Sequence, residues 1–143
     1  MILMRGVPGS GKSTLAKKLA EDFRVCGYTC EIHSTDNYFI VNGEYKFNPA
    51  LLGVNHHKNQ DAVKDALSRG IEVVIVDNTN LSAKERKNYI DTAATFNYTT
   101  ELRDSNTSWA KNAEECAKRN THGVPLEAIQ RMLLKLESDT DVL

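Results

Sequence analysis

Short apolar runs alternate with longer amphipathic segments along most of this chain. Residues 1–4 are apolar and lead into a glycine-rich turn, and residues 10–27 then carry leucine and phenylalanine at every fourth position, as on one face of a helix. Residues 29–35 form a second short strand candidate, and residues 71–76 form a continuous apolar run of the kind buried on both faces of a sheet. This alternation predicts parallel strands joined by helices.

A hairpin interrupts the alternation after the second strand. Residues 38–47 place Asn42 and Gly43 between two segments rich in β-forming residues, and Asn-Gly is a strong signal for a two-residue turn. We therefore expect a small hairpin insertion before the next helix, which is predicted over residues 48–70 with alanine, valine and leucine facing inward.

The second half of the chain predicts one more strand and three helices. Ser82 and Glu85 have the spacing of a capping box at a helix start. The expected helix, strand, helix and helix occupy residues 82–96, 97–104, 108–120 and 125–138. The full order predicts an α/β fold: a doubly wound parallel sheet flanked by helices, with right-handed crossovers. We expect one domain over residues 1–143.

Composition and charge narrow the classes of protein. A chain of 143 residues with 41% hydrophobic and 26% charged positions is typical of one soluble domain. Its formal net charge of -1 argues against an extended footprint on nucleic acid and stays compatible with a short cleft for a few phosphates. Three cysteines without metal-binding spacing, no signal-like start and no run of membrane-spanning length predict a cytoplasmic or nuclear protein without a membrane.

The turn after the first apolar run carries the most specific chemical signal. Residues 6–13, GVPGSGKS, match G-x-x-x-x-G-K-[ST] between a predicted strand and a predicted helix. In such a loop, backbone N–H groups and the helix N-terminus attract phosphate oxygens, the lysine reaches the terminal phosphates, and the serine hydroxyl ligates Mg²⁺. The residues predicted to bind ATP are Pro8, Gly9, Ser10, Gly11, Lys12, Ser13 and Thr14, with Ser13 also serving the metal.

Two aspartates follow predicted strands, at the sheet edge where open parallel sheets bind ligands. Asp77 follows the apolar run, a position typical of an acid that holds Mg²⁺. Asp36 follows the second strand and suits two roles equally: the cap of a turn, or the base that accepts the proton of an acceptor hydroxyl. Asn78, Thr79 and Asn80 are predicted substrate contacts, with ordinary turn residues as the alternative.

Three residues near the predicted fourth helix also have a structural and a functional interpretation. Arg119 either favours the helix dipole at a helix end or closes over the transferring phosphoryl group, as an arginine finger does. Trp109 either anchors packing, the more common role, or stacks on a base. For His122 we expect a surface role more than an acceptor contact.

Four segments together carry a resemblance to a known family: GVPGSGKST, STDNYF with GEYKFNPALLG, VVIVDNTN, and CAKRNTHGVPLEAIQRML. They resemble the kinase domain of the Nedd-ligase-binding proteins, a branch of the polynucleotide-kinase-like P-loop kinases. The resemblance covers nearly the whole chain, and its KRNTHGVP segment is more specific than the phosphate loop. It implies a P-loop NTPase fold of the nucleotide-kinase type, and 5′-hydroxyl polynucleotide kinase activity with ATP and Mg²⁺.

The resemblance also implies roles for individual residues. Asp36, in the D-x-Y segment, corresponds to the general base, and Arg119 to the first arginine of the lid. Lys12 and Ser13 correspond to the phosphate-loop lysine and serine, and Asp77 to the acid after the third strand.

The chain departs from more distant members of the same group. Phage polynucleotide kinase has an arginine where this chain has Phe39, and a second arginine in a longer lid. The group also includes the kinase-like half of a cyclic-nucleotide phosphodiesterase, which needs two H-x-[ST] motifs in another domain. Residues 33–35, His-Ser-Thr, are a single match, so we do not expect that activity.

Three functions follow from these observations. The leading hypothesis is transfer of a phosphoryl group from ATP to a 5′-hydroxyl at a single-stranded nucleic-acid end. A kinase for a small-molecule acceptor would use the same machinery and agrees with the near-zero net charge. The third is an ATP-binding module that binds a protein partner with little catalysis, which the missing arginines favour.

Overall fold

A parallel sheet of four strands forms the centre of the computed structural model, which describes residues 1–140. The strands are β1 (Ile2–Arg5), β2 (Cys30–His33), β5 (Val73–Val76) and β6 (Glu101–Asp104). Their order across the sheet is β2-β5-β1-β6, and every neighbouring pair is parallel. Within these residues, no helix is long and apolar enough to cross a membrane. The predicted parallel α/β sheet is confirmed.

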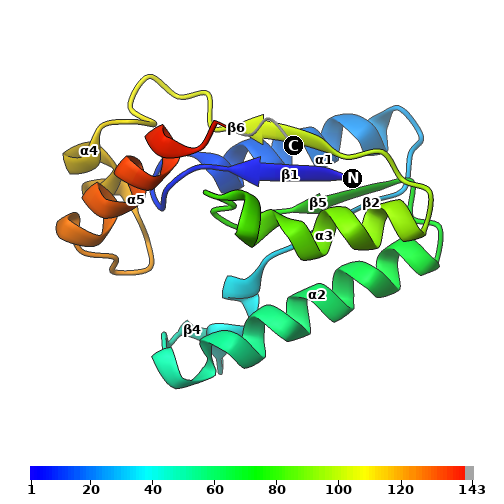
Figure 1. Cartoon of the computed structure of the whole chain (residues 1–143), viewed down its shortest axis with the longest axis horizontal. Helices are drawn as coiled ribbons and strands as arrows, with labels where there is room; N and C mark the ends of the chain where they lie inside the picture. Colours follow the sequence, from blue (N-terminus) through cyan, green and yellow to red (C-terminus); the bar gives the residue numbers. More distant parts are fainter. Residues whose placement is uncertain (141–143) are drawn as a thin grey trace.

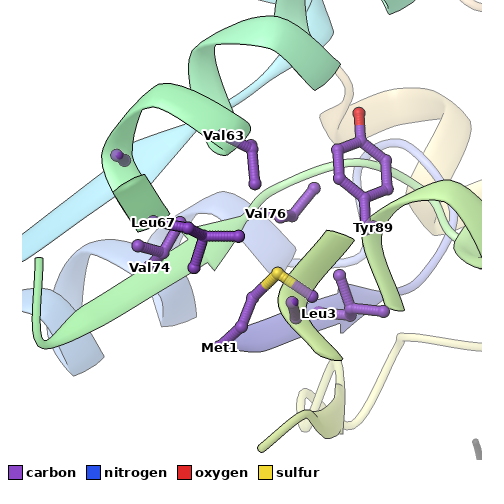
Figure 2. Packing of buried hydrophobic residues seen from close by; sticks show 9 residues of the cluster. Met1, Leu3, Val63, Leu67, Val74, Val76 and Tyr89 are labelled. Atoms are coloured by element: carbon purple, nitrogen blue, oxygen red, sulfur yellow. The ribbon is translucent and has the colours of Figure 1, made fainter. Parts of the chain in front are cut away.

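Helices cover both faces of the sheet, because alternate side chains of its central strands point to opposite faces. Helix α1 (Lys12–Val25) packs on one face, while α2 (Leu52–Ser68) and α3 (Ala83–Thr95) pack on the other (Figure 1). The strand side chains facing α1 are Ile2, Met4 and Ile75, and those facing α2 and α3 are Leu3, Val74 and Val76 (Figure 2). These buried strands form the core that supports the phosphate loop and the acidic strand ends.

The hairpin follows the second strand, as predicted. A 3-10 helix, η1 (Thr35–Phe39), leads into strands β3 (Ile40–Val41) and β4 (Glu44–Tyr45), which pair antiparallel. Asn42 and Gly43 both have positive φ, 53° and 82°, as their turn requires. A short 3-10 turn, η2 (Pro49–Leu51), precedes α2, so the regular helix begins four residues later than the sequence pattern predicts.

Two further helices, α4 (Ala113–Arg119) and α5 (Leu126–Ser138), lie beyond the carboxyl ends of the strands (Figure 1). Their apolar side chains pack around Val7 of the phosphate loop and Leu81, with Cys116 and Ile129 fully buried. This small core fixes the two helices, with the loop between them, against the nucleotide end of the sheet. We call residues 113–138 the lid.

A buried ion-pair network joins the end of α5 to the central sheet. Asp139 accepts hydrogen bonds from Arg86 at 2.7 and 3.1 Å and from Arg5 at 2.7 Å. The side chains of Arg86 and Asp139 are only 1% and 5% exposed, so both charges depend on each other for solvation. Asp139 directly follows the last predicted helix, and the network gives it a structural role. Residues 141–143 lie outside the described part of the chain.

Candidate active site

A cavity of 710 Å³ opens at the carboxyl ends of the strands. Its walls come from the phosphate loop, η1, the hairpin, the start of α2 and the lid. Of the residues predicted for the site, those that line it are Pro8, Gly9, Gly11, Lys12, Ser13, Thr14, Asp36, Asn78, Thr79 and Arg119. The topology thus brings together side chains from four separate segments of the chain.

Around Gly9 and Gly11, the phosphate loop presents its backbone to the cavity. Gly9 and Gly11 have φ of 80° and 92°, a region that side-chain-bearing residues rarely adopt. Gly11 is the N-cap of α1, and no side chain caps this helix. The N-terminal N–H groups of α1 therefore face the cavity with their partial positive charge available to an anion. This arrangement suits the phosphates of a nucleotide.

Contacts from outside the loop hold its shape. Trp109 donates from Nε1 to the Gly9 carbonyl oxygen at 3.0 Å, and the Thr107 hydroxyl donates to the Ser10 carbonyl oxygen at 2.7 Å. A Cβ atom at Gly9 would collide with the carbonyl oxygen of Cys116 in α4. Ser10 itself is buried, and its hydroxyl pairs with that of Ser105 at 2.7 Å. The Ser10 side chain is therefore a structural group, and the part of Ser10 in binding ATP through the loop backbone stays a prediction.

Lys12 lines the cavity and pairs with Asp77, a buried residue that is not among those lining the cavity. Lys12 Nζ lies 3.6 Å from Asp77 Oδ1, and their side chains are 10% and 8% exposed. That carboxylate oxygen is buried and has no hydrogen-bond partner among residues 1–140. Mg²⁺ in kinases is held by one or two protein oxygens and by substrate phosphates, so an unsatisfied carboxylate oxygen beside the phosphate loop fits it. Asp77 and the Ser13 hydroxyl are the residues that would hold the ion.

Asp36 stands on another wall of the cavity and does not cap its own turn. Ser34 performs that role, because its Oγ accepts the Asp36 N–H at 3.3 Å. The Asp36 carboxylate is half-exposed and contacts Tyr45 at 3.4 Å and His122 at 3.3 Å. Since Ser34 already caps the turn, the capping alternative for Asp36 is not what the structure shows, and its carboxylate lines the cavity.

The three polar residues after Asp77 have different surroundings. Asn78 Oδ1 accepts the Thr35 N–H at 2.9 Å, so Asn78 ties the end of β5 to η1 while it lines the cavity. Thr79 also lines the cavity, and its carbonyl accepts the Gly6 N–H at 3.1 Å. Asn80 is 2% exposed and donates to the Met4 carbonyl at 2.7 Å. The prediction of Asn80 as a substrate contact is wrong, because its side chain faces the core.

Arg119 is the last residue of α4 and lines the cavity. Its guanidinium lies 3.7 Å from the centre of the Trp109 ring, and its Nε donates to Glu115 at 2.7 Å. Trp109 packs against the cluster of Val7 and Cys116, as expected of a packing residue, and it also lines the cavity. The stacking and the ion pair hold Arg119 at the cavity wall above the phosphate loop.

Phe39 occupies the position at which the phage enzyme has an arginine, and here it is a core residue. It is 2% exposed, and the centre of its ring lies 6.1 Å from that of Tyr45 and 5.1 Å from that of Phe47. These rings form the apolar base of the hairpin, so a charge at residue 39 would be buried. The hairpin is thus supported by aromatic packing at the point where the phage enzyme places a cation.

The sheet, the phosphate loop and the lid define a P-loop kinase-like domain. Comparison with known proteins agrees: the chain belongs to the AAA_33 family, an AAA domain, whose pattern matches residues 1–138. It is 44% identical over 133 residues to NEDD4-binding protein 2 of Homo sapiens, a match that covers 93% of this chain and 7% of that protein. This confirms the family resemblance inferred from the four sequence segments.

More distant relatives share the fold. The chain is 24% identical over 139 residues to 2′,3′-cyclic-nucleotide 3′-phosphodiesterase of Rattus norvegicus, covering 97% of this chain and 31% of that protein. Among solved structures, it resembles a chain of the Pnkp1/Rnl/Hen1 RNA repair complex, with a TM-score of 0.72 and 19% identity. The match covers 95% of this chain and 43% of that chain. It also resembles the APS kinase CysC of Mycobacterium tuberculosis, with a TM-score of 0.62 and 20% identity. This match covers 85% of this chain and 68% of that chain. The chain thus spans less than a third of these curated relatives.

Proposed function

We propose that this chain transfers the γ-phosphoryl group of ATP to a 5′-hydroxyl end of a polynucleotide. The observation that carries the proposal is the shared cavity, in which the phosphate loop with Lys12 forms one wall and Asp36 another. A kinase needs a phosphate cradle and a base within one water-excluding space, and these are its two parts. The likeness to a chain of an RNA repair complex supports a nucleic-acid acceptor.

The residues divide the reaction as follows. Asp36 accepts the proton of the acceptor hydroxyl while that oxygen bonds to the γ-phosphorus. The bond between the γ-phosphorus and its bridging oxygen breaks, and ADP leaves with the electron pair. Lys12 and Arg119 supply positive charge where the equatorial oxygens gain negative charge. Mg²⁺, held by Ser13 and Asp77, would neutralise phosphate charge when bound.

The test is incorporation of label from γ-labelled ATP into a single-stranded oligonucleotide with a free 5′-hydroxyl. The same strand carrying a 5′-phosphate, and a reaction without acceptor, are the controls. We expect label on the hydroxyl strand alone. Absence of label from that strand, with ATP binding intact, would contradict the proposal.

A small-molecule acceptor is the second candidate, and the lining of the cavity favours it. Among the described residues that line the cavity, Lys12 and Arg119 are the lysine and arginine side chains, whereas Tyr45, Phe47 and Leu52 form an apolar wall. A wall with few cations suits a compact acceptor better than a run of phosphates. Label transferred to a nucleoside or sugar and to no oligonucleotide would identify this function.

We also propose that the protein acts in the cytoplasm or nucleus. Its three cysteines, Cys26, Cys30 and Cys116, are unpaired, which agrees with a reducing compartment.

A further inference from the structure

Two side chains from different elements meet at the Asp36 carboxylate. Tyr45 of β4 donates its hydroxyl to Asp36 Oδ1 at 3.4 Å, and His122, in the loop between α4 and α5, lies with Nδ1 3.3 Å from Asp36 Oδ2. The rings of Tyr45 and His122 stack on each other, with centroids 4.0 Å apart and planes inclined by 17°. Each carboxylate oxygen therefore has its own neighbour, and the two neighbours support each other.

The lid loop is built to hold His122 in this place. Asn120 Oδ1 accepts the N–H groups of His122 and Val124 at 3.2 and 2.9 Å. Its Nδ2 donates to the carbonyl oxygens of Ala117 and Val124 at 2.8 and 3.1 Å. One side chain thus fixes both limbs of the loop, so the position of His122 follows from the backbone of the lid and not from the histidine alone.

The chemistry of the two neighbours suits donation to a carboxylate. Burial, and then the negative charge of Asp36, raise the pKa of Tyr45 to about 12, so the phenol keeps its proton at neutral pH. An imidazole that carries its proton on Nδ1 is a hydrogen-bond donor, and His122 Nδ1 lies within ion-pair distance of the other oxygen. The Asp36 side chain is 46% exposed, and without these donors few contacts would restrict its rotation.

We propose that Tyr45 and His122 are positioning residues for Asp36, and that His122 makes the orientation of this base depend on the lid. The inference rests on the proposed function in one respect, the role of Asp36 as the base. The Tyr45 hydrogen bond at one oxygen and the His122 contact at the other restrict the carboxylate to one orientation toward the cavity, and transfer to a positioned hydroxyl depends on that orientation. Because His122 belongs to the lid, the base is fully oriented only while the lid lies as described.

Kinetics on four variants separate the hydrogen bonds from the stacking. His122→Ala removes both, whereas His122→Asn keeps an N–H donor at the position of Nδ1 without the ring. Tyr45→Phe keeps the ring without the donor. His57→Ala is the control, because His57 is exposed on α2 and lines a separate groove. Transfer of label from ATP to the 5′-hydroxyl strand is the activity measured.

We expect kcat to fall about tenfold in His122→Ala and about threefold in Tyr45→Phe, with the KM for ATP changed by less than about twofold. His122→Asn should recover most of the loss, and His57→Ala should match the wild type. Unchanged kcat in His122→Ala would overturn the proposal. So would a His122→Asn variant as slow as His122→Ala, because the polar contact with Asp36 would then not be the cause.

An NMR measurement tests the contact without any turnover. In protein labelled with ¹⁵N in its histidine rings, Asp36→Asn should move the Nδ1 resonance of His122 and leave that of His57 in place. An unmoved His122 resonance would overturn the proposal. If wild-type protein labels no oligonucleotide, the proposed function fails, and this resonance still decides whether the lid holds Asp36.

Discussion

The two sides of the cavity are built in different ways. The nucleotide side is a backbone loop at a helix N-terminus, and Trp109 and Thr107 hydrogen-bond to its carbonyl groups from behind. The acceptor side is made of side chains, among them Asp36, which is half-exposed, and Phe47, which is 53% exposed at the base of a short hairpin. One side is packed into the core, and the other presents partly exposed side chains from η1, the hairpin and the lid loop.

The difference suggests how such a domain changes its acceptor. A substitution at the nucleotide side disturbs the packing of the lid and the sheet, because the loop touches both. A substitution at the hairpin or the lid loop alters side chains that contribute little to the core. We therefore expect changes on the acceptor side to affect phosphoryl transfer with ATP binding preserved, and changes on the nucleotide side to affect folding and ATP binding together.

Asp36→Asn is expected to have the largest effect and to be confined to chemistry. Removal of a general base costs about 10³-fold in rate, or about 4 kcal/mol of transition-state stabilisation. Transfer to the 5′-hydroxyl strand is measured beside ATP affinity by calorimetry, with Asp61→Asn on the exposed side of α2 as control. A loss of ATP affinity as large as the loss of rate would break the distinction between the two sides.

Asp139→Asn tests whether the ion-pair network of Asp139 contributes to the stability of the fold around the nucleotide side. Removal of one partner from a buried ion pair costs about 3 kcal/mol of the free energy of unfolding, here by leaving Arg86 undercompensated. Urea unfolding at pH 7 measures the loss. Hydrogen bonds from Arg86, and then from Arg5, lower the pKa of Asp139. Its stabilising effect is therefore complete above the usual aspartate pKa of about 3.9 and is lost as the pH falls below it.

The difference in stability between the wild type and the Asp139→Asn variant should consequently shrink as the pH falls below about 3.9 and through the lowered pKa of Asp139. A stability difference that stayed constant over the acid range would show that the carboxylate charge is not what the network uses.

Gly9→Ala and Gly123→Ala form a matched pair that contrasts the two sides most directly. Both glycines have positive φ, 80° and 68°, so each alanine costs about 1 kcal/mol in backbone strain. At Gly9 the new Cβ also meets the Cys116 carbonyl, whereas nothing lies within 4 Å of it at Gly123. We expect Gly9→Ala to lose about 2 kcal/mol more in thermal or urea unfolding, and to lose ATP affinity as well. Equal losses would refute the tight packing of the loop.

Local patterns predicted most of the fold because they depend on neighbouring residues. The Asn42-Gly43 turn has the positive φ values that its sequence requires, and Ser82 and Glu85 form the capping box in both directions. Lys12 and Asp77 were likewise placed at one site by the rule that parallel strands present their carboxyl ends at a common edge.

The misses are contacts between residues far apart in the sequence. Asp139 pairs with Arg5 across 134 positions, and nothing local marks Arg86 as a fully buried arginine. Asn78 and Asn80 are two positions apart and have the same side chain. The turn geometry, with φ of 47° at Asn80, places the Asn80 side chain in the core. His122 reaches Asp36 through the shape of the lid loop, which its sequence does not reveal.

The chain contains a single tryptophan, and its environment makes it a natural optical probe. The Trp109 indole is hydrogen-bonded to the Gly9 carbonyl on one edge and covered by the Arg119 guanidinium on one face. Any molecule that rearranges the loop or moves Arg119 changes the polarity around the indole ring, and therefore the wavelength and intensity of its fluorescence emission. Nucleotide binding should therefore change the intrinsic tryptophan fluorescence of the protein.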